Sequence, residues 1–494
     1  MACFLGIDIG GTVTKAGLYS ADGHEVSVAE RYAEVLSPQP GFTERDMEEL
    51  WQTVCDVIRE VVYDSRVNPT DILGVSFSSH GKGLYAIDHE GSPVRNGIIS
   101  SDTRALSLVQ QWQEQGVDSL TYPRGLQQLW TAHPATLLRW LKINEPENYA
   151  RISAVLMVHD YVRYRLTGVI AAEVTNISGS NLYNQHTRDY DPQLMEAFGI
   201  SEVRHKTAPV VGSTEQAGTV TESAALACGL AAGTPVYGGL FDVVASAVCS
   251  GVCDDRILSA VAGTWSIATC VTDSIIPAEY PYVWGSYCVP GKYFVHEGSP
   301  TSAANLAWFM RNFCGDQDTP YQQFDQWVAE RSGHDTEIVF LPYLFGSNYS
   351  LNLAGGLVGM RSHHEKADII YALYEGIVFS HLLHQDRILQ LNPQVKRIRI
   401  TGGPTHSPVW MQMFADAGNL PLDVIDIKQS GCRAAALCAA VGRGYYADFA
   451  AAIAATQPYV RTYMPQKEAH LQLRRQMARY LNTAKALSEV SYAQ

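Results

Sequence analysis

The sequence has few of the patterns that mark disulfide-rich or metal-binding proteins. Its ten cysteines include no CxxC pair, and no group of Cys and His has the spacing of a zinc site. In a chain of 494 residues this usage predicts reduced thiols in a cytoplasmic protein without a structural metal. No secretory leader precedes the first apolar segment, residues 3–9.

Positive charge is also scarce. Lys and Arg total 36 against 50 Asp and Glu, which gives a formal net charge of −14 at pH 7. Because like charges repel, we expect neither a nucleic-acid backbone nor an anionic membrane as a partner. The longest charge-poor stretch, residues 224–252, is interrupted by Gly238, Gly239 and Asp242. A buried turn, strand and helix fit it better than a membrane span.

Two familiar nucleotide-binding loops are missing. No segment matches GxxxxGK[ST], and no GxGxxG follows a strand, so neither a P-loop fold nor a dinucleotide site of that kind is supported. The chain does contain 46% hydrophobic residues, enough for a sizeable core, and its length suits two to four units.

Two distant stretches share the order strand, tight turn, strand. The paired segments are 3–9 with 13–19, and 257–261 with 266–271. A helix over 47–62 and a strand over 72–78 follow the first pair, and a strand over 395–401 follows the second. The repeat predicts a duplicated α/β unit with a nucleotide held between the halves.

The first turn carries groups that suit a phosphate site. Gly10 and Gly11 let backbone N–H groups approach an anion. Asp8 supplies the negative charge to hold Mg²⁺ through its water molecules, and Thr12 offers a hydroxyl to a phosphate oxygen. Lys15 lies just beyond the turn. A plain hairpin whose Asp caps the turn is the alternative.

The second half offers similar chemistry. Gly263 and Thr264 form its tight turn, again with a plain hairpin as the alternative. Gly402 and Gly403 end a later strand, and a helix is expected to begin near Ser407 or Pro408. Bare backbone at these two glycines leaves room for a base or ribose. We therefore expect these residues to contact a nucleotide.

A single carboxylate, Asp242, follows Gly238 and Gly239 inside an apolar region where a helix is expected to start. A helix N-terminus keeps a carboxylate ionised and able to accept a proton. Asp is also a favoured helix cap, so a purely structural role stays open. The preceding glycines indicate that something approaches closely.

In this order the segments resemble the FGGY family of carbohydrate kinases, which shares the duplicated ribonuclease-H-like fold of actin and hexokinase. The matching stretches are the first phosphate motif at 8–12, the catalytic Asp region at 239–242, the second phosphate motif at 263–264, the C-terminal signature at 374–380 and the adenosine motif at 402–403. Each stretch is unspecific alone, but five in order are specific.

The resemblance implies two ribonuclease-H-like (actin/hexokinase-like) α/β domains with an interdomain cleft. Residues 1–250 would hold the sugar, the first phosphate loop and the catalytic Asp, and residues 251–494 the second phosphate loop and the adenosine. It also implies ATP and Mg²⁺ as cosubstrates, a small-molecule sugar as the acceptor, and Asp242 as the base that takes the proton of the sugar hydroxyl.

Four further residues are sugar-site candidates. The loop after strand 72–78 faces the cleft in this fold, so we expect His80, Gly81 and Lys82 to contact the sugar, with a solvated loop as the alternative. Asp160 is either an acceptor for sugar hydroxyls or the cap of the helix that it begins.

Several short stretches look closest to the L-xylulose kinase (3-keto-L-gulonate kinase) branch. They are residues 37–41, 81–84, 130–134, 159–161, 181–184 and 345–348. We therefore expect L-xylulose or a related open-chain keto-sugar as the acceptor, with D-xylulose, ribulose, glycerol and erythritol as alternatives.

The chain departs from the family pattern at three residues. His80 stands where Gln is usual in this branch, and Arg433 and Ala434 stand where an apolar residue and Gly are usual. Ala434 is expected to crowd a helix start and weaken ATP binding. An actin-like ATPase and a non-catalytic sugar sensor are rival classes, although a sensor is expected to lack Asp8 or Asp242. A homodimer is common in the family, and the sequence leaves the oligomeric state open.

Overall fold

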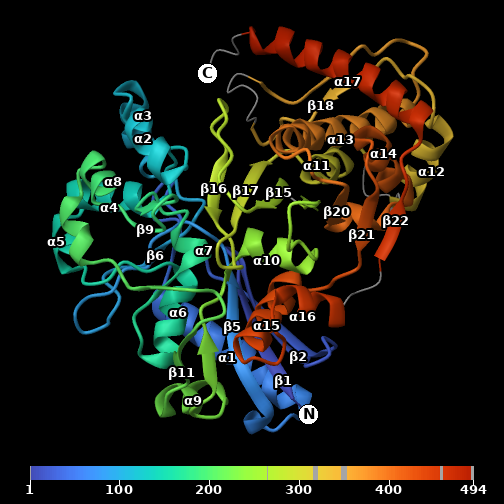
Figure 1. Ribbon diagram of the computed structural model, residues 1–494. Coiled ribbons are helices and arrows are strands. Elements are labelled where there is room, and N and C mark those ends of the chain that lie inside the picture. The colour runs from blue at the N-terminus through green and yellow to red at the C-terminus, as the bar shows by residue number, and fades with distance from the viewer. Residues whose placement is uncertain (1, 264, 315–320, 347–352, 457–459, 491–494) are drawn as a thin grey trace. The chain divides into compact units, whose positions relative to one another are not determined.

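The computed structural model describes residues 2–263, 265–314, 321–346, 353–456 and 460–490 (Figure 1). The chain forms two compact units. The first unit comprises Met1–Cys253, Thr272–Phe294 and Lys428–Gln457, and the second comprises Asp254–Val271, Val295–Ile427 and Pro458–Gln494. The late segment Lys428–Gln457 therefore folds with the first half of the chain. The expected domains 1–250 and 251–494, with their separate binding roles, stay a prediction.

The first unit is built on a mixed sheet of order β11-β12-β5-β1-β2-β3, with β13 also paired to β5. These strands are β1 (Cys3–Ile9), β2 (Val13–Ser20), β3 (Glu25–Tyr32), β5 (Ile72–Ser79), β11 (Gln216–Thr219), β12 (Pro235–Tyr237) and β13 (Leu240–Phe241). The central strand β1 runs antiparallel to β2 and parallel to β5. It is apolar at almost every position because both of its faces are covered.

Two long helices cover this sheet. α1 (Met47–Ser65) lies against β2 and β3, and the Asp46 carboxylate caps it by accepting from two backbone N–H groups. α15 (Ser430–Gly442) lies against β1 and β5 (Figure 1). Gly6 makes that approach possible, since a Cβ there would come within 1.8 Å of the Cys432 carbonyl oxygen.

The other elements of the first unit are short. Its helices are α2 (Leu106–Glu114), α3 (Val117–Gly125), α4 (Pro134–Asn144), α5 (Pro146–Arg151), α6 (Val158–Thr167), α7 (Val174–Ile177), α8 (Pro192–Ala197), α9 (Glu222–Cys228), α10 (Asp242–Cys249) and α16 (Phe449–Ala455), with 3₁₀ turns at Pro69–Asp71 and Ser201–His205. Its two-residue strands are β4 (Glu44–Arg45), β6 (Gly97–Ile98), β7 (Ala172–Glu173), β8 (Tyr183–Asn184), β9 (Asp189–Tyr190) and β10 (Val210–Val211).

The second sheet has the order β16-β17-β15-β14-β20-β21-β22. Its strands are β14 (Ile257–Ala262), β15 (Ser266–Thr272), β16 (Val283–Ser286), β17 (Tyr293–Ser299), β20 (Arg397–Thr401), β21 (Leu422–Ile425) and β22 (Val460–Tyr463). The elements of the second unit outside this sheet are β18 (Val339–Leu341), β19 (Gly356–Val358), α11 (Ala304–Phe313), α12 (Tyr321–Arg331), α13 (Lys366–Leu391), α14 (Pro408–Gly418), α17 (Lys467–Ser488) and a 3₁₀ turn at Gly403–His406.

The two sheets repeat one topology. In the first, the hairpin β1–β2 continues through parallel β5 and β12 to an antiparallel β11. In the second, the hairpin β14–β15 continues through parallel β20 and β21 to an antiparallel β22. The duplicated α/β organisation expected from the sequence is confirmed.

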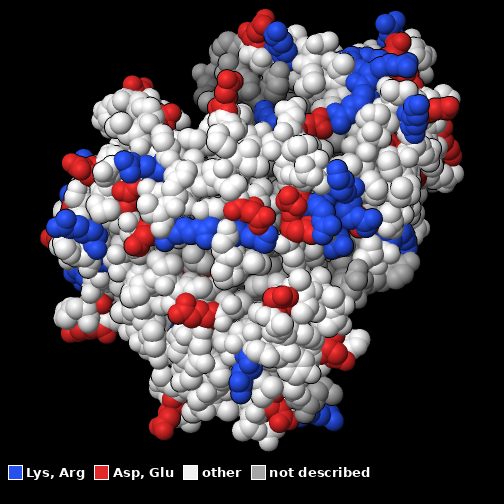
Figure 2. Space-filling model, in the orientation of Figure 1, with Lys and Arg blue, Asp and Glu red and all other residues white. Residues whose placement is uncertain are grey.

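On the face shown in Figure 2, Lys and Arg lie in small groups beside Asp and Glu, among wider uncharged areas. Among the described residues, no helix has the length and apolar character needed to cross a bilayer. The stretch 224–252 contains the end of α9, the short strands β12 and β13 and the helix α10, so the expected strand and helix are present and a helix precedes them. All ten cysteines are free thiols.

Candidate active site

Three neighbouring strands of the first sheet bring charged groups together. Ser78 of β5 pairs in register with Asp8 of β1 on one side and with Leu240 of β13 on the other. The three strands are parallel, so their carboxyl ends lie at one edge of the sheet, where open α/β sheets place their ligands. Asp242 follows β13 directly, and Lys82 lies in the loop after β5.

Asp242 is a half-buried carboxylate at the first position of α10. Its pKa is raised to about 7: burial raises it most, the negative charge of Asp8 adds to this, and the Val243 N–H and the Lys82 ammonium act in the opposite direction. The expected effect of the helix N-terminus is therefore outweighed, because desolvation and a like charge both disfavour the ionised form. A carboxylate that titrates near neutrality is well matched to accepting a proton.

Asp8 is held close to a helix start. Burial raises the pKa of its carboxyl, while a hydrogen bond with Ser78 and the charge of Lys15 lower it. A Cβ at Gly431 would lie 2.3 Å from Cγ of Asp8, so only glycine lets the first turn of α15 reach this carboxylate. Sequence reasoning missed this contact because 422 positions separate the two residues along the chain.

Lys82 has an unusual environment for a lysine. Its backbone adopts φ 62°, a left-handed conformation that side-chain-bearing residues rarely take. Its Nζ lies 5.1 Å from the ring centroid of Trp130, and burial lowers its pKa to about 8, with Asp242 acting against that shift. The charges of Lys82 and Asp242 therefore influence each other's pKa.

His80 is a buried neutral imidazole. Its Nδ1 lies 3.1 Å from the Gly81 carbonyl oxygen and its Nε2 lies 3.3 Å from the hydroxyl of Tyr85. Burial lowers the pKa of the ring to about 4, and nearby Arg45 adds to that effect. Contact of His80, Gly81 and Lys82 with a sugar stays a prediction.

The glycines before the base serve packing within the protein. A Cβ at Gly238 would come within 2.3 Å of the Gly212 carbonyl oxygen, and Gly239 has φ 118° beside Phe77. A Cβ at Gly81 would lie 2.4 Å from the ring of Phe241. Something does approach these glycines closely, as the sequence indicated, but it is the chain itself.

Asp160 is fully buried in α6. One oxygen accepts from the Met157 N–H at 3.1 Å, and the other accepts from the Glu173 N–H at 2.9 Å and from Arg163 at 3.0 Å. These hydrogen bonds are those expected if Asp160 caps α6. We therefore do not include Asp160 in the proposed sugar site.

The first phosphate turn divides into structural and open positions. A Cβ at Gly10 would meet the Val13 carbonyl oxygen at 2.9 Å, whereas a Cβ at Gly11 would find its nearest neighbour, Ile99, at 3.6 Å. Thr12 is exposed. Lys15 contacts Gln429 at 2.8 Å and the Glu30 carboxylate at 3.3 Å. Gly11 and Thr12 are thus open to a ligand.

The second unit shows the same division. A Cβ at Gly402, whose φ is 114°, would lie 2.1 Å from the Ala262 carbonyl oxygen. Among the described residues, a Cβ at Gly403 would have no neighbour within 4 Å, and one at Gly263 would have none closer than 3.9 Å. Thr264 lies outside the described residues, as do Ser347 and Asn348 of the branch-specific stretch.

Ser407 caps α14. Its hydroxyl accepts from the Trp410 N–H at 3.2 Å and donates to Asp325 at 2.6 Å. The helix begins at Pro408, as the sequence indicated. The hydroxyl therefore donates one hydrogen bond and accepts another within the protein. Contact with an adenosine stays a prediction.

Two residues of α15, Arg433 and Ala434, depart from the family pattern, and both contact other parts of the protein. Arg433 donates to the backbone carbonyls of Gly23 and Thr456. Ala434 is fully buried in the helix that packs on β1 and β5. Its expected effect on ATP binding stays a prediction.

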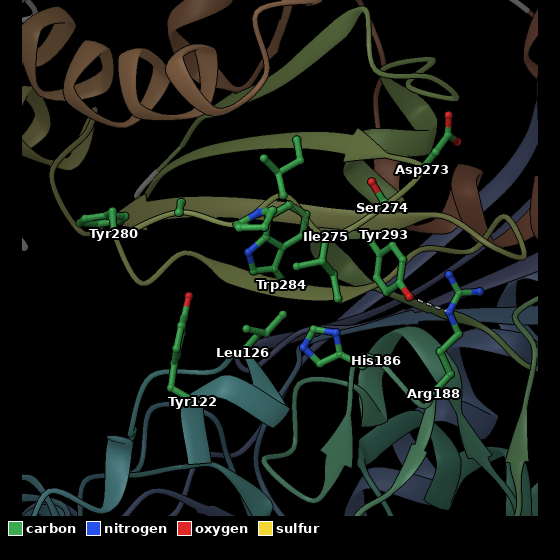
Figure 3. Close-up of a pocket in the computed structure, with 13 residues that line it drawn as sticks. Tyr122, Leu126, His186, Arg188, Asp273, Ser274, Ile275, Tyr280, Trp284 and Tyr293 are labelled. Atoms are coloured by element: carbon green, nitrogen blue, oxygen red, sulfur yellow. Dashed lines mark hydrogen bonds between the residues drawn. The ribbon is translucent and has the colours of Figure 1, made fainter. Parts of the chain in front are cut away.

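A separate cavity of about 530 Å³ opens on the first unit (Figure 3). Aromatic and basic side chains line it, among them Tyr122, His186, Arg188, Trp284 and Tyr293. Arg188 Nε donates to the Tyr293 hydroxyl at 3.0 Å. None of the residues predicted for sugar or nucleotide binding lines this cavity, so it is not the candidate active site.

Comparison with known proteins gives a consistent result. The chain matches the FGGY family of carbohydrate kinases, with the N-terminal domain over residues 3–249 and the C-terminal domain over residues 258–443. It is 44% identical to the L-xylulose/3-keto-L-gulonate kinase of Escherichia coli, over 98% of this chain and 97% of that protein.

Two further similarities extend this comparison. The chain is 46% identical to a probable L-xylulose kinase of Pasteurella multocida, over 91% of this chain and 92% of that protein. In fold it is similar to a ligand-bound xylulose kinase of Lactobacillus acidophilus, with a TM-score of 0.92 and 21% identity, over 99% of each chain. The chain belongs to the FGGY family of carbohydrate kinases.

Proposed function

We propose that this sugar kinase transfers the γ-phosphate of ATP to a hydroxyl of L-xylulose or a related open-chain keto-sugar. The observation that carries the proposal is Asp242, a carboxylate with a pKa of about 7 at the sheet edge that Asp8 and Lys82 share. The names of the relatives at 44% and 46% identity support the sugar class.

The reaction needs a proton acceptor beside the attacking hydroxyl. Asp242 takes the proton as the sugar oxygen bonds to the γ-phosphorus, and the bond from that phosphorus to the β–γ bridging oxygen breaks to release ADP. A base that titrates at about 7 is substantially ionised at neutral pH and still has the basicity to accept a proton. Catalysis otherwise consists of positioning and charge neutralisation.

The described residues suit a triphosphate and its metal. Gly11, Gly263 and Gly403 have room for a Cβ, so no described residue requires glycine there, whereas a close-lying phosphate or nucleoside would. Asp8 is a half-buried carboxylate of the kind that holds Mg²⁺ through its waters. When bound, Mg²⁺ would neutralise phosphate charge. We assign Thr12 and Lys15 to the phosphates and Ser407 to the adenosine side, as the family resemblance implies.

Lys82 supports a second acceptor, the carboxylated keto-sugar 3-keto-L-gulonate. Its ammonium lies over the Trp130 ring, and the charge of Asp242 raises its pKa. The ammonium would pair with a substrate carboxylate. A neutral pentulose would instead use His80 and the backbone around Gly81. The two acceptors therefore differ in their dependence on a single side chain.

The test is ADP release with ATP and Mg²⁺ against L-xylulose, 3-keto-L-gulonate, D-xylulose, ribulose, erythritol and glycerol. We expect kcat/KM for L-xylulose to exceed that for glycerol at least about tenfold. Lys82→Met should lower activity toward 3-keto-L-gulonate selectively. If glycerol or D-xylulose is the best substrate, the assignment of the sugar is wrong although the chain is still a kinase.

The proposal also includes the location of the enzyme and its oligomeric state. We place the enzyme in the cytoplasm, on the support of its ten free thiols. We also propose a homodimer, because dimers are common in the family that the chain resembles. Light scattering on the purified protein checks the second point.

A further inference from the structure

The backbone that precedes Asp242 is held by a buried side chain. The Phe241 N–H donates to Oγ1 of Thr175 at 2.9 Å, and the Thr175 hydroxyl donates to Oε2 of Glu173 at 2.7 Å. A hydroxyl has a single proton, so its donation to the carboxylate leaves a lone pair that faces the Phe241 N–H. Thr175 and Glu173 are both fully buried.

Glu173 sets the direction in which these hydrogen bonds are donated. Besides the Thr175 hydroxyl, the Glu173 carboxylate accepts from the Thr175 N–H at 2.9 Å, the Asn176 N–H at 3.1 Å and the Ser213 hydroxyl at 2.7 Å. A carboxylate that accepts four hydrogen bonds cannot rotate away without leaving buried donors unpaired. The Thr175 hydroxyl is therefore held in one orientation.

The same segment also contacts the proposed sugar loop. The Asn176 side-chain amide donates to Oγ of Ser79 at 3.2 Å and to the His80 carbonyl oxygen at 3.4 Å. Because a Cβ at Gly81 would lie within 2.4 Å of the Phe241 ring, the sugar loop and the base segment also pack directly on each other. Neighbouring residues of α7 thus hold both loops.

We infer that Thr175 is a positioning residue for the phosphoryl transfer: through the Phe241 N–H it fixes Asp242 relative to the sugar loop that Asn176 holds. The inference rests on the proposed function, in which Asp242 is the base. Thr175 itself contacts no reacting atom. Its effect is expected in turnover, since a small displacement of a catalytic group costs far more rate than affinity.

The test compares three variants of the full chain. Thr175→Val keeps the shape and removes both hydrogen bonds, and Thr175→Ser keeps the hydroxyl. Ser213→Ala is the matched control, because it removes a donor to the same carboxylate and leaves the Phe241 N–H bonded to Thr175. We expect kcat to fall at least about tenfold in Thr175→Val, with KM for ATP and for the sugar within about twofold of the parent. Thr175→Ser and Ser213→Ala should keep kcat within about twofold.

Asp242→Asn, assayed in parallel, separates this inference from the proposed function. If Asp242→Asn turns over normally, the base assignment fails and the inference falls with it. If Asp242→Asn is inactive while Thr175→Val is as fast as the parent, only the inference is overturned. An equal loss of kcat in Thr175→Val and Ser213→Ala would also overturn it, because the effect would then belong to the Glu173 surroundings in general. If Thr175→Val does not fold, Thr175→Ala takes its place, with the same expected fall in kcat and the same rescue by Ser.

Discussion

The two units share a strand order but hold their turns with chemically different groups. In the first unit the sheet edge carries Asp242, with a pKa of about 7, and Lys82, with a pKa of about 8. In the second, the turn after β14 is tied to neutral groups: Gly263 accepts from the Ala303 N–H, and His381 bridges Ser266 and Ser302. Burial lowers the pKa of His381 to about 3, so its ring is uncharged at neutral pH.

This difference assigns separate duties to similar scaffolds. Groups that titrate near pH 7 can exchange a proton during a reaction, which we propose for the first unit. Neutral, fixed donors and bare backbone can hold an anion without competing for the proton, which we propose for the second. A duplicated fold can therefore divide proton transfer and nucleotide holding between its copies.

The largest expected effect lies in the first unit. Asp242→Asn should lower kcat about a hundredfold or more, because the amide cannot accept the proton of the sugar hydroxyl. Steady-state ADP release checks this, with ATP binding and the thermal unfolding midpoint expected to stay near those of the parent. Near-normal turnover would show that Asp242 serves only the structure at the start of α10 and would remove the contrast between the units.

A pair of adjacent glycines tests the holding role of the second unit. Gly403→Ala should raise KM for ATP about tenfold without loss of stability, because its Cβ meets no atom of the described residues within 4 Å and would displace a ligand. Gly402→Ala is the matched control. Its Cβ would lie 2.1 Å from the Ala262 carbonyl oxygen at φ 114°, so it should destabilise the fold by about 1–3 kcal/mol.

The first unit contains the same kind of test. Gly11→Ala should raise KM for ATP as Gly403→Ala does, since a Cβ there comes no closer than 3.6 Å to Ile99. Unchanged ATP kinetics in both variants, with unfolding midpoints like the parent's, would show that neither open glycine faces the nucleotide. The assignment of Gly11 and Gly403 to the nucleotide would then be wrong.

The pH dependence should differ between neutral and carboxylated sugars. The base must be ionised, so kcat/KM for L-xylulose should fall as the pH drops below about 7 and level off above it. The Lys82 ammonium is lost above about pH 8, so 3-keto-L-gulonate should show an additional alkaline fall. Lys82→Met should abolish the alkaline fall. It should also shift the acidic fall to higher pH, because the cation that lowers the pKa of Asp242 is gone. Identical profiles for the two sugars would place Lys82 outside the acceptor site.

The sequence was sufficient for the fold because the relevant signals are local. Apolar strands around Gly10 and around Gly263, and the helix over 47–62, are visible within short windows, and the structure has them with ends shifted by at most a few residues.

What the sequence could not supply depends on packing between distant segments. Gly238 and Gly402 look like ligand contacts in the sequence, yet backbone carbonyls of Gly212 and Ala262 occupy the space that a side chain would need. The pKa of Asp242 rises instead of falling because burial and Asp8 outweigh the helix start. Neither fact is encoded in a local pattern.

The smallest expected effect on turnover concerns a buried carboxyl of the second unit that lies outside the proposed chemistry. Glu375 of α13 has its pKa raised from 4.5 to about 8, mainly by burial and then by Asp335, with Arg479 acting in the opposite direction. A carboxyl whose pKa rises on folding binds its proton more tightly in the folded state. Its contribution to stability is therefore complete below about pH 4.5 and is lost as the pH rises toward about 8.

Glu375→Gln imitates the protonated form and should remove this loss. We expect the variant to unfold a few degrees above the parent at pH 8 and at nearly the same temperature at pH 5, with kcat within about twofold at both. Thermal melts at the two pH values, together with ADP release, check the prediction. A variant that melts below the parent at pH 8 would mean that the ionised Glu375 stabilises the fold. A large fall in kcat would instead extend titrating chemistry to the second unit, and the division of duties between the two units would no longer hold.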